Sequence, residues 1–521
     1  MEPNTGHPRR RPILAVMCLS LLIVVIDSTI LNTALPTLAR VLKASTTDLQ
    51  WITDAYSLVF AALLIVAGGL GDRYGRRRGL LLGLGIFGAG SIAAALSGDT
   101  AALIAARAVM GVGAAFVMPA TLSIINAVFP VRERAGAIGA WSAVAGLGVV
   151  AGPTLGGLLL NHFYWGSVFW LNIPLVAAAM LAAVLVVPDL PGQRTSGRLD
   201  VLGAVLSAAG LVALVDAVIE GPDRGWASGK TLTVAGAGLV LLAGFIVREL
   251  SAKNPLLDVR VFKHRAFSAA TVAIAITLFA LFGSLFALTQ YLQLVHGYSP
   301  LAAGIRALPF AAGVMALAPV SSILVRAVGA RVVIPAGLSA MAAGLFVLTR
   351  IDTTSGYGIV AVGIAIMGVG MGLVLAPAGE SIMSVLPPEQ AGVGSAVNDT
   401  VQELGGALGV AVIGSIVSAS FRHSLDTSGL PASLIQAARP SVANANAVAA
   451  HAGPSGGHLL LVAHQGYTTA MTGGFAVAGT VAVIGAVLAA AALPSRRRVA
   501  ATAEPTPTTD ADQLTADAVL V

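Results

Sequence analysis

The sequence contains very little charge for its length. Only 10% of its 521 residues are Asp, Glu, Lys or Arg, whereas 56% are hydrophobic. Water-soluble domains carry about 25% charged residues, so most of the surface of this chain does not face water. Aromatic residues are also scarce, at 5%, but glycine is abundant, with 60 residues. Because small residues let membrane helices approach closely, this composition indicates a helical membrane protein rather than several soluble domains.

Other absences narrow the possible functions. The single cysteine, Cys18, excludes an intramolecular disulfide and a metal site built from cysteines. The sequence shows no phosphate-cradling Walker loop, nucleophile elbow or metal-ligand cluster, which argues against an enzyme and against an ATP-driven pump. The net charge is +6, but the basic residues stand in short clusters between apolar runs. We therefore expect no nucleic-acid partner, no resident cofactor and no metal.

Long apolar runs recur along the whole chain. A run of about 20 residues crosses about 30 Å of hydrocarbon, and fourteen runs approach or exceed this length. We predict membrane spans at 13–35, 51–70, 79–97, 101–127, 136–160, 166–187, 199–219, 230–250, 266–293, 303–325, 331–349, 357–385, 395–418 and 468–493. Most of the 30 Lys and Arg residues then fall on one side, which predicts a multi-pass protein of the cell membrane with both termini cytoplasmic. We interpret the first run as a retained span, because it is too long for a cleaved signal peptide.

The predicted fold is an all-α polytopic membrane protein with two six-helix bundles and two inserted helices. We expect a cytoplasmic N-terminus at 1–12, bundles at 13–190 and 266–493, inserted spans at 199–250, an extracytoplasmic loop at 421–467 that serves as a tether, and a disordered cytoplasmic tail at 494–521. A faint repeat supports two related halves, because short Arg/Gly turns at 71–77 and 326–331 follow the second span of each bundle. Duplicated halves around a central site are common in transporters.

Four local patterns carry a resemblance to a known family. They are GGLGDRYGRRR at 68–78, GLGVVAGPTLGG at 146–157, DSTILNTALP at 27–36 and LIAARAVMGVG at 103–113. Together they resemble the major facilitator superfamily, and specifically its fourteen-span drug:proton antiporters. The resemblance covers nearly the whole chain, apart from the two tails and the outer loop, and it implies the major facilitator fold.

The resemblance also implies roles for two of these motifs. The first would latch the two halves on the cytoplasmic side through Gly71, Asp72, Arg73, Gly75 and Arg76, although simple positive-inside anchoring also explains its arginines. The second would be the antiporter motif, with glycines for close helix contact and a proline that bends the helix. An ordinary glycine-packed span is the alternative for this segment. The antiporter-motif residues are Gly148, Gly152, Pro153, Gly156 and Gly157.

Two charges inside predicted spans are placed at the same depth. At about 1.5 Å per residue, Asp27 lies about 21 Å from the inner end of the first span, and Arg107 lies about 9 Å from the outer end of the fourth. In a core about 30 Å thick these depths coincide. Each charge alone would cost about 2.5–3.5 kcal/mol to insert. We therefore predict that Asp27 and Arg107 face the central cavity and interact.

The other intramembrane acids are candidates for carrying protons. Asp399 and Glu403 are four residues apart and share one helix face. Two neighbouring carboxyl groups in a low dielectric resist ionising together, which favours a proton on one of them. Glu380 is expected near the same inner vestibule. Asp54 lies about one turn into its span, so either a proton site or a solvated interface residue is consistent with its position. The alternative for Asp399 and Glu403 is also a position at the membrane interface.

The function predicted from these features is export of hydrophobic compounds by proton antiport with alternating access, driven by the proton motive force. An acidic cavity suits hydrophobic cations, but Arg107 works against that preference, so the charge of the substrate stays open. The expected partners are small hydrophobic substrates, protons and the lipid bilayer, and we expect a monomer. One alternative is a dedicated exporter of one endogenous metabolite, lipid or self-made antibiotic. A membrane protein without transport activity is the other.

Overall fold

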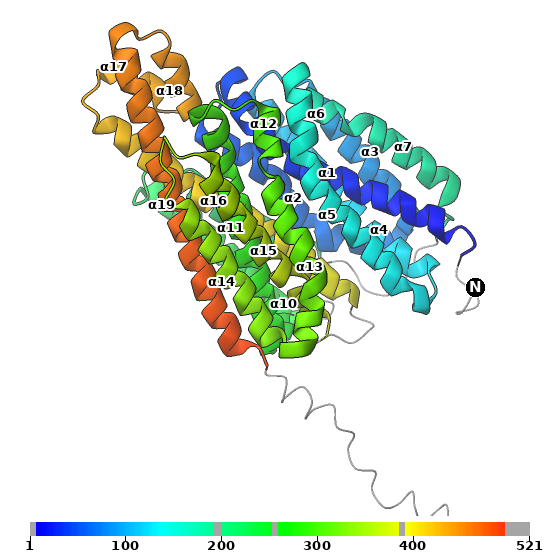
Figure 1. Ribbon diagram of the computed structural model, residues 1–521. Helices are drawn as coiled ribbons and strands as arrows, with labels where there is room; N and C mark the ends of the chain where they lie inside the picture. Colours follow the sequence, from blue (N-terminus) through cyan, green and yellow to red (C-terminus); the bar gives the residue numbers. More distant parts are fainter. Residues whose placement is uncertain (1–6, 191–199, 253–258, 385–390, 495–521) are drawn as a thin grey trace, which may run out of the picture.

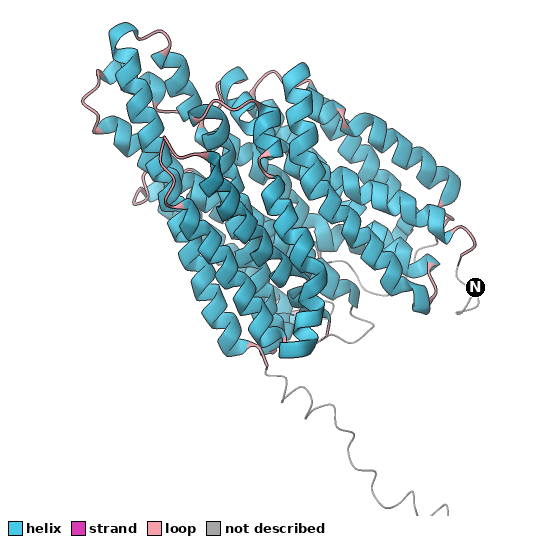
Figure 2. Ribbon diagram, in the orientation of Figure 1, coloured by secondary structure: helices cyan, strands magenta, loops and turns pink. Residues whose placement is uncertain are grey.

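The computed structural model describes residues 7–190, 200–252, 259–384 and 391–494. Within these ranges the regular secondary structure is entirely helical, and the helices are joined by short turns (Figure 2). Two helical bundles stand side by side, blue to cyan and green to orange in Figure 1. The C-terminal tail predicted at 494–521 lies, from residue 495 onward, outside the described residues.

The first bundle contains the helices up to residue 186. Its elements are α1 (Arg10–Val41), α2 (Thr46–Tyr74), α3 (Arg76–Ala95), α4 (Thr100–Val128), α5 (Val131–His162), α6 (Ser167–Trp170) and α7 (Asn172–Val186). Polar caps set some of these boundaries. Ser45 and Asp48 form a reciprocal capping box at the start of α2, and Asp99 accepts from the backbone N–H of Ala102 at 2.8 Å at the start of α4.

The inserted pair follows the first bundle and packs as a hairpin. It comprises α8 (Val201–Ile219), the single turn α9 (Gly221–Arg224) and α10 (Gly229–Ser251). α8 contacts both α2 of the first bundle and α16 of the second. A small apolar cluster joins the three helices, with Leu58 from α2, Val215 and Ile219 from α8, and Ala407 and Ala411 from α16. The inserted pair therefore covers the line along which the two bundles meet on this flank.

The second bundle contains the remaining long helices and two short ones at one end. Its elements are the 3-10 turn Val259–Lys263, α11 (Arg265–Gln290) with a π-helical extension (Tyr291–Val295), α12 (Pro300–Ile305), α13 (Leu308–Val328), α14 (Ala330–Leu348), α15 (Tyr357–Met383), α16 (Ala391–Asp426), α17 (Ala432–Ala438), α18 (Val442–Ala449), the 3-10 turn Gly453–Ser455 and α19 (Gly456–Ala492). We call the end of the molecule that carries α17 and α18 the outer end, and the end where α1 begins and α19 terminates the inner end (Figure 1).

The predicted spans correspond closely to the observed helices. Thirteen stretches in the described ranges are long and apolar enough to cross a membrane. Each coincides with one of the fourteen predicted spans, and the span predicted at 51–70 coincides with α2, a 29-residue helix that is not among the thirteen. The span predicted at 166–187 is divided into α6 and α7. The fold class is thereby confirmed, whereas the count of fourteen and the side of the termini stay predictions.

The repeat expected from the two Arg/Gly turns has a structural counterpart. Gly75 separates α2 from α3 with φ +112°, and Gly329 separates α13 from α14 with φ +89°. Each glycine N–H donates to the carbonyl four residues earlier, at 3.0 Å and 2.8 Å respectively. A positive φ is easily adopted only by glycine. The second and third long helices of both bundles are thus joined by the same one-residue turn.

The segment predicted as a loop at 421–467 is mostly helical, which differs from the expected tether. α16 continues to Asp426, α17 and α18 follow, and α19 begins at Gly456, well before the span predicted from residue 468. The apolar residues Leu459, Ala463 and Tyr467 are buried at helical spacing on one face of α19. The backbone N–H of Thr46 in the first bundle donates to the carbonyl of Pro440 at 3.0 Å, so these outer helices also contact the other half.

The two bundles are packed together at the outer end and separated at the inner end. At the outer end of α5, α12 lies close enough that Gly304 is in backbone contact with Pro153. At its inner end, a Cβ added at Gly139 or Gly146 would meet nothing within 4 Å. On α13, Met315 and Ile323 are exposed. The bundles accordingly diverge toward the lower edge of Figure 1, and the molecule is open toward the inner end.

Candidate functional site

A buried charge pair lies inside the first bundle. Asp27 is on α1 and Arg107 is on α4, and both residues are at most 1% exposed. Arg107 Nη1 donates to Asp27 Oδ2 at 2.5 Å. Asn172, the first residue of α7, donates from Nδ2 to the other Asp27 oxygen at 2.9 Å and to Ser91 Oγ on α3 at 3.0 Å. The pair and this amide therefore connect four helices of the bundle.

The Arg107 guanidinium also contacts α2. Its Nε donates to the carbonyl of Ile52 at 3.2 Å, and its central carbon lies 4.3 Å from the centre of the Tyr56 ring, a cation–π distance. The predicted contact between Asp27 and Arg107 is thus present. Both side chains are buried and neither lines the cleft described below, so the predicted position facing the central cavity stays a prediction. Ion pairing and hydrogen bonds within the protein compensate these charges.

Three other acids lie where α2 of the first bundle packs against α16 of the second. Asp54 is fully buried, and neither of its carboxyl oxygens has a hydrogen-bond partner. Glu403 on α16 lies beside Ser57 on α2. Asp399, one turn before Glu403, accepts from the Asn398 side chain at 3.1 Å. Among the described residues, no Lys or Arg forms an ion pair with any of these three acids.

Glu380 is placed differently from the other acids. It is exposed near the inner end of α15. The adjacent Gly379 faces α16, because a Cβ there would lie 3.9 Å from Asn398 Oδ1. Glu380 is therefore on the inner side of the same helix pair as Asp399, as expected, but its side chain faces solvent rather than the buried seam.

The glycines of the motif at 146–157 form a close contact between α5 and α1. Gly148, Gly152 and Gly156 all face α1, and a Cβ on any of them would come closer than 3.0 Å to a side-chain atom there. At Gly152 the clash would be with the Thr29 hydroxyl. These positions exclude any larger residue unless the helices move apart.

The remaining residues of this motif contact the second bundle. A Cβ at Gly157 would lie 2.7 Å from the carbonyl oxygen of Pro300. A Cβ at Gly304 on α12 would overlap the carbonyl oxygen of Pro153. Pro153 lies within α5, where it removes one backbone donor. One face of the motif thus packs within the first bundle, and another closes the outer end between the bundles.

The turn predicted as a gating loop lies at the inner end. Gly71 and Arg73 belong to the last turns of α2, Gly75 is the link, and Arg76 begins α3. A Cβ at Gly79 would lie 3.2 Å from the Cα of Gly71, so α2 and α3 nearly touch here. The side chain of Asp72 lies outside the described residues.

The arginines that follow this turn contact the first bundle. Arg77 donates to the carbonyl of Val184 on α7 at 2.7 Å, and Arg78 lies 4.0 Å from Asp189. The loop is therefore anchored to the end of α7 in this conformation, and its role as a latch between the bundles stays a prediction.

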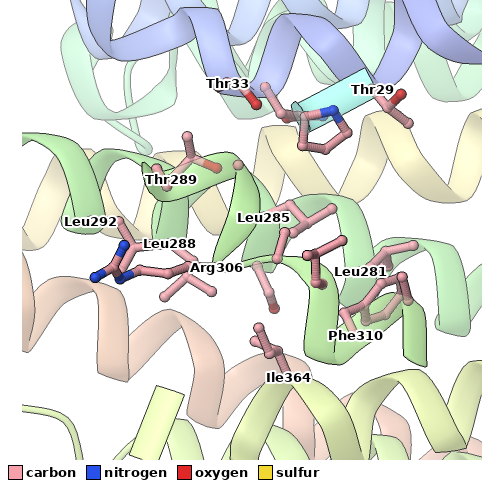
Figure 3. A pocket seen from close by; sticks show the side chains of 18 of the residues that line it. Thr29, Thr33, Leu281, Leu285, Leu288, Thr289, Leu292, Arg306, Phe310 and Ile364 are labelled. Atoms are coloured by element: carbon pink, nitrogen blue, oxygen red, sulfur yellow. The ribbon is translucent and has the colours of Figure 1, made fainter. Parts of the chain in front are cut away.

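A cleft lies between the bundles near the outer end. Its walls come from α1, α5, α11, α12, α13 and α15. Leu281, Leu285, Phe310 and Ile364 line it, and Thr29 lies on the opposite wall (Figure 3). The lining is mostly aliphatic with few polar groups, as in binding sites for hydrophobic small molecules.

Comparison with known proteins identifies the family. The model of the Major Facilitator Superfamily matches residues 17–410. The chain belongs to this superfamily. The superfamily consists of transporters, so this protein is a multi-pass membrane transporter rather than an enzyme, as the sequence predicts.

Several curated members of the superfamily are similar over most of their length. The tetracenomycin C resistance and export protein of Streptomyces glaucescens is 34% identical, covering 94% of this chain and 92% of that protein. The multidrug resistance protein Stp of Mycobacterium tuberculosis is 37% identical, covering 78% and 76% respectively. The methyl viologen resistance protein SmvA of Salmonella typhimurium is 35% identical, covering 86% and 91%.

Solved structures of the superfamily share the fold. A bacterial homologue of the human lysosomal transporter Spinster, in an inward-facing and unoccupied conformation, aligns with a TM-score of 0.67 at 18% identity. The alignment covers 94% of this chain and 99% of that one. At this identity the similarity concerns the fold alone.

A polar network at the outer end was not predicted from the sequence. Asp223 on α9 pairs with Arg422 on α16 and accepts from the Thr47 hydroxyl on α2 at 2.8 Å. Trp51 on α2 donates to Glu220 at 3.3 Å. The inserted hairpin thus makes polar contacts with both superfamily bundles. Charged residues beside predicted span ends were the available signal, although the partners are far apart in the sequence.

Arg306 is a second residue that sequence reasoning missed. It lines the cleft just after α12, one turn into the span predicted at 303–325. Its position near a span end made it resemble an interfacial anchor, although the predicted span already enclosed it. In the inserted pair, Asp216 forms an ion pair with Arg224 at 2.6 Å.

Proposed function

We propose that this transporter exports hydrophobic small molecules across the cell membrane in exchange for protons. Family membership supports export of small molecules, because its relatives include resistance and export proteins. The observation that carries the proton coupling is the set of acids between α2 and α16, above all the fully buried and unpartnered Asp54. Within the described ranges no Lys or Arg pairs with this carboxyl group, so a proton is the simplest counter-charge available to it.

The energetic argument distinguishes these acids from ordinary buried charges. An ionised carboxylate without partners is costly in a membrane interior, and the neutral acid is far less so. Asp54 and Glu403 lie on opposite bundles along one seam. When the bundles move, the surroundings of these groups change with them. A proton bound in one conformation can then be released in the other, which is the requirement for coupling.

The packing of the two ends supports alternating access. The outer end is closed where α5 meets α12, and the inner end is open. Opening the outer end requires the contact between Pro153 and Gly304 to separate. Rocking of two bundles around a central cleft satisfies this requirement without unfolding either bundle.

The test uses inside-out membrane vesicles that contain the full chain. Vesicles energised by a proton gradient should accumulate ethidium or another compound from a panel of hydrophobic toxins. An ionophore that collapses the gradient should abolish the accumulation. If none of the compounds is accumulated in a gradient-dependent manner, the proposal fails.

The proton-carrying role is tested in the same vesicles. Asp54→Asn, Asp399→Asn and Glu403→Gln proteins should show a flattened dependence of transport on pH, whereas the exposed control Glu380→Gln should behave as the unmodified protein. An unaltered pH profile in all three variants would remove these acids from the coupling mechanism.

A dedicated exporter of one compound is the second candidate. One relative, which is similar over 94% of this chain, is named for resistance to and export of a single compound. Susceptibility of an expressing strain to a panel of toxic compounds separates the candidates. Increased tolerance to several unrelated compounds favours multidrug export, and tolerance to one compound favours the dedicated exporter.

A further inference from the structure

The lining of the cleft between the bundles bears on the open question of the substrate's charge. Among the described residues that line it there is no Asp or Glu, and the one charged side chain is Arg306. The acids proposed for proton coupling, Asp54, Asp399 and Glu403, are not part of the lining. A hydrophobic cation in this cleft would therefore meet a positive charge and no carboxylate.

The Arg306 side chain is held in a defined position. Its guanidinium carbon lies 3.9 Å from the centre of the Tyr298 ring and 5.2 Å from that of Tyr357. Nη1 donates to the carbonyl of Ala302 at 3.1 Å, and the Tyr357 hydroxyl donates to the backbone carbonyl of Arg306 at 2.9 Å. Aromatic stacking occupies the faces of a guanidinium but leaves its edge donors available.

The edge of the Arg306 guanidinium carries a hydrogen-bond donor that has no acceptor. Nε of Arg306 is buried and has no hydrogen-bond partner. No ion pair joins Arg306 to an acid within the described part of the chain. A buried donor without an acceptor is costly and calls for an explanation. An acceptor supplied by a ligand satisfies it.

Two uncharged polar groups in the cleft share this property. Ser284 Oγ on α11 and Asn32 Oδ1 on α1 are buried and have no partner, and both residues line the cleft. They lie on helices of opposite bundles, within walls that are mostly aliphatic. A ligand with a hydrogen-bonding group on its apolar body can satisfy them.

We propose that the cleft binds a hydrophobic organic acid, with its carboxylate on Arg306 and its apolar body among the leucines of α11. In Figure 3 the Arg306 side chain runs beside Leu288 and Leu292, with Leu285 and Leu281 farther along the same helix. A guanidinium is suited to carboxylates because its edge offers paired donors. This inference rests on the proposed export function and specifies the charge of its substrate.

The test is a binding comparison between compounds that differ only in charge. The full chain is placed in nanodiscs of zwitterionic phosphatidylcholine. Dansyl-labelled undecanoic acid, its methyl ester and the corresponding dansyl-labelled amine are titrated by fluorescence. The acid should bind at least about tenfold more tightly than the ester, as expected for a hydrogen bond between charged groups. Equal affinities, or tighter binding of the amine, would overturn the proposal.

Variants assign the preference to one side chain. Arg306→Gln should remove the advantage of the acid over the ester, and Arg306→Lys should retain part of it because the charge remains. Arg350→Gln is the matched control, since Arg350 is an exposed arginine at the outer end of α14 and does not line the cleft. If Arg306→Gln keeps the full preference while folded, as judged by size-exclusion chromatography, Arg306 is not the anion site.

Two further measurements are needed. One distinguishes an anionic lipid from an exported acid as the ligand of Arg306, and the other distinguishes failure of this inference from failure of the proposed function. Nanodiscs containing phosphatidylglycerol report whether an anionic lipid competes with the acid. Competition in the unmodified protein that disappears in Arg306→Gln would identify a lipid headgroup as the occupant and overturn the exported acid. Gradient-driven ethidium accumulation without any preference for the acid would remove this inference and leave the proposed function standing, whereas absence of all transport would remove the proposed function.

Discussion

The molecule treats buried carboxyl groups in two different ways. Inside the first bundle, Asp27 has an arginine at 2.5 Å and an amide at 2.9 Å. Along the seam between the bundles, Asp54 is equally buried but has no partner. The first arrangement fixes helices to one another because every charge is compensated. The second leaves a charge whose compensation must come from outside the protein. The comparison separates a carboxyl group that holds the structure from one suited to exchange a proton.

The largest expected effect is at the compensated pair. Arg107→Ala leaves Asp27 buried without its cation, which should cost about 3–5 kcal/mol of stability. Thermal unfolding of the detergent-solubilised protein measures this loss. The double variant Asp27→Asn with Arg107→Gln should recover much of it, because no unpaired charge remains. Unfolding of Arg107→Ala at the same temperature as the exposed control Arg350→Ala would contradict the structural role of the pair.

A smaller loss is expected at the amide beside this pair. Asn172→Ala removes one donor from Asp27 and one from Ser91. Leaving buried acceptors without a donor costs about 1–3 kcal/mol. The same unfolding assay should show a decrease between those of Arg107→Ala and the control. No decrease would mean that the ion pair alone secures Asp27.

The polar network at the outer end should contribute less. Arg422 pairs with Asp223, whose side chain is 37% exposed, so the loss in Arg422→Ala should be about 1 kcal/mol. The contact joins the inserted hairpin to the second bundle, so its removal should also loosen the outer end. Distances between spin labels on α9 and α16, measured by electron paramagnetic resonance, should broaden. A distribution identical to that of the unmodified protein would show that apolar packing holds the hairpin by itself.

The smallest stability effect is expected at the uncompensated acid. Asp54→Asn removes a carboxyl group that has no partner to lose, so the stability should stay within about 0.5 kcal/mol of the unmodified protein or increase. Thermal unfolding and transport should be measured on the same preparation of this variant. Its stability should be unchanged, whereas the pH dependence of its transport should be altered. A large destabilisation by Asp54→Asn would erase the distinction between the two kinds of buried acid.

Much of the fold could be predicted from the sequence because the membrane imposes a length on each helix. The same relation between helix length and membrane thickness predicted the ion pair, because Asp27 and Arg107 fall at equal depth in spans of opposite direction. It could not predict the hydrogen bonds of Asn172 with Asp27 and Ser91, because uncharged polar residues hardly change the hydropathy of an apolar run. It also failed at 421–467, where α17 and α18 are held by contacts at the outer end rather than by hydrocarbon.

The candidate site was predicted less completely than the fold. Asp399 and Glu403 were expected on one helix face, but the proximity of Glu403 to Ser57 depends on how two distant helices pack. Arg306 was overlooked because a charge near a span end usually marks an interface. Its stacking between Tyr298 and Tyr357 brings together residues from three separate segments, which sequence spacing does not reveal.

The inserted hairpin has a consequence for how lipid-dissolved compounds reach the interior. It covers the flank where α2 meets α16, whereas on the other flank Leu147 near the middle of α5 and Ile323 in the inner half of α13 are exposed. A compound dissolved in the surrounding lipid therefore meets less covering protein on the flank of α5 and α13 than on the flank of α2 and α16. The two additional helices make a nearly symmetric pair of bundles one-sided toward the surrounding lipid.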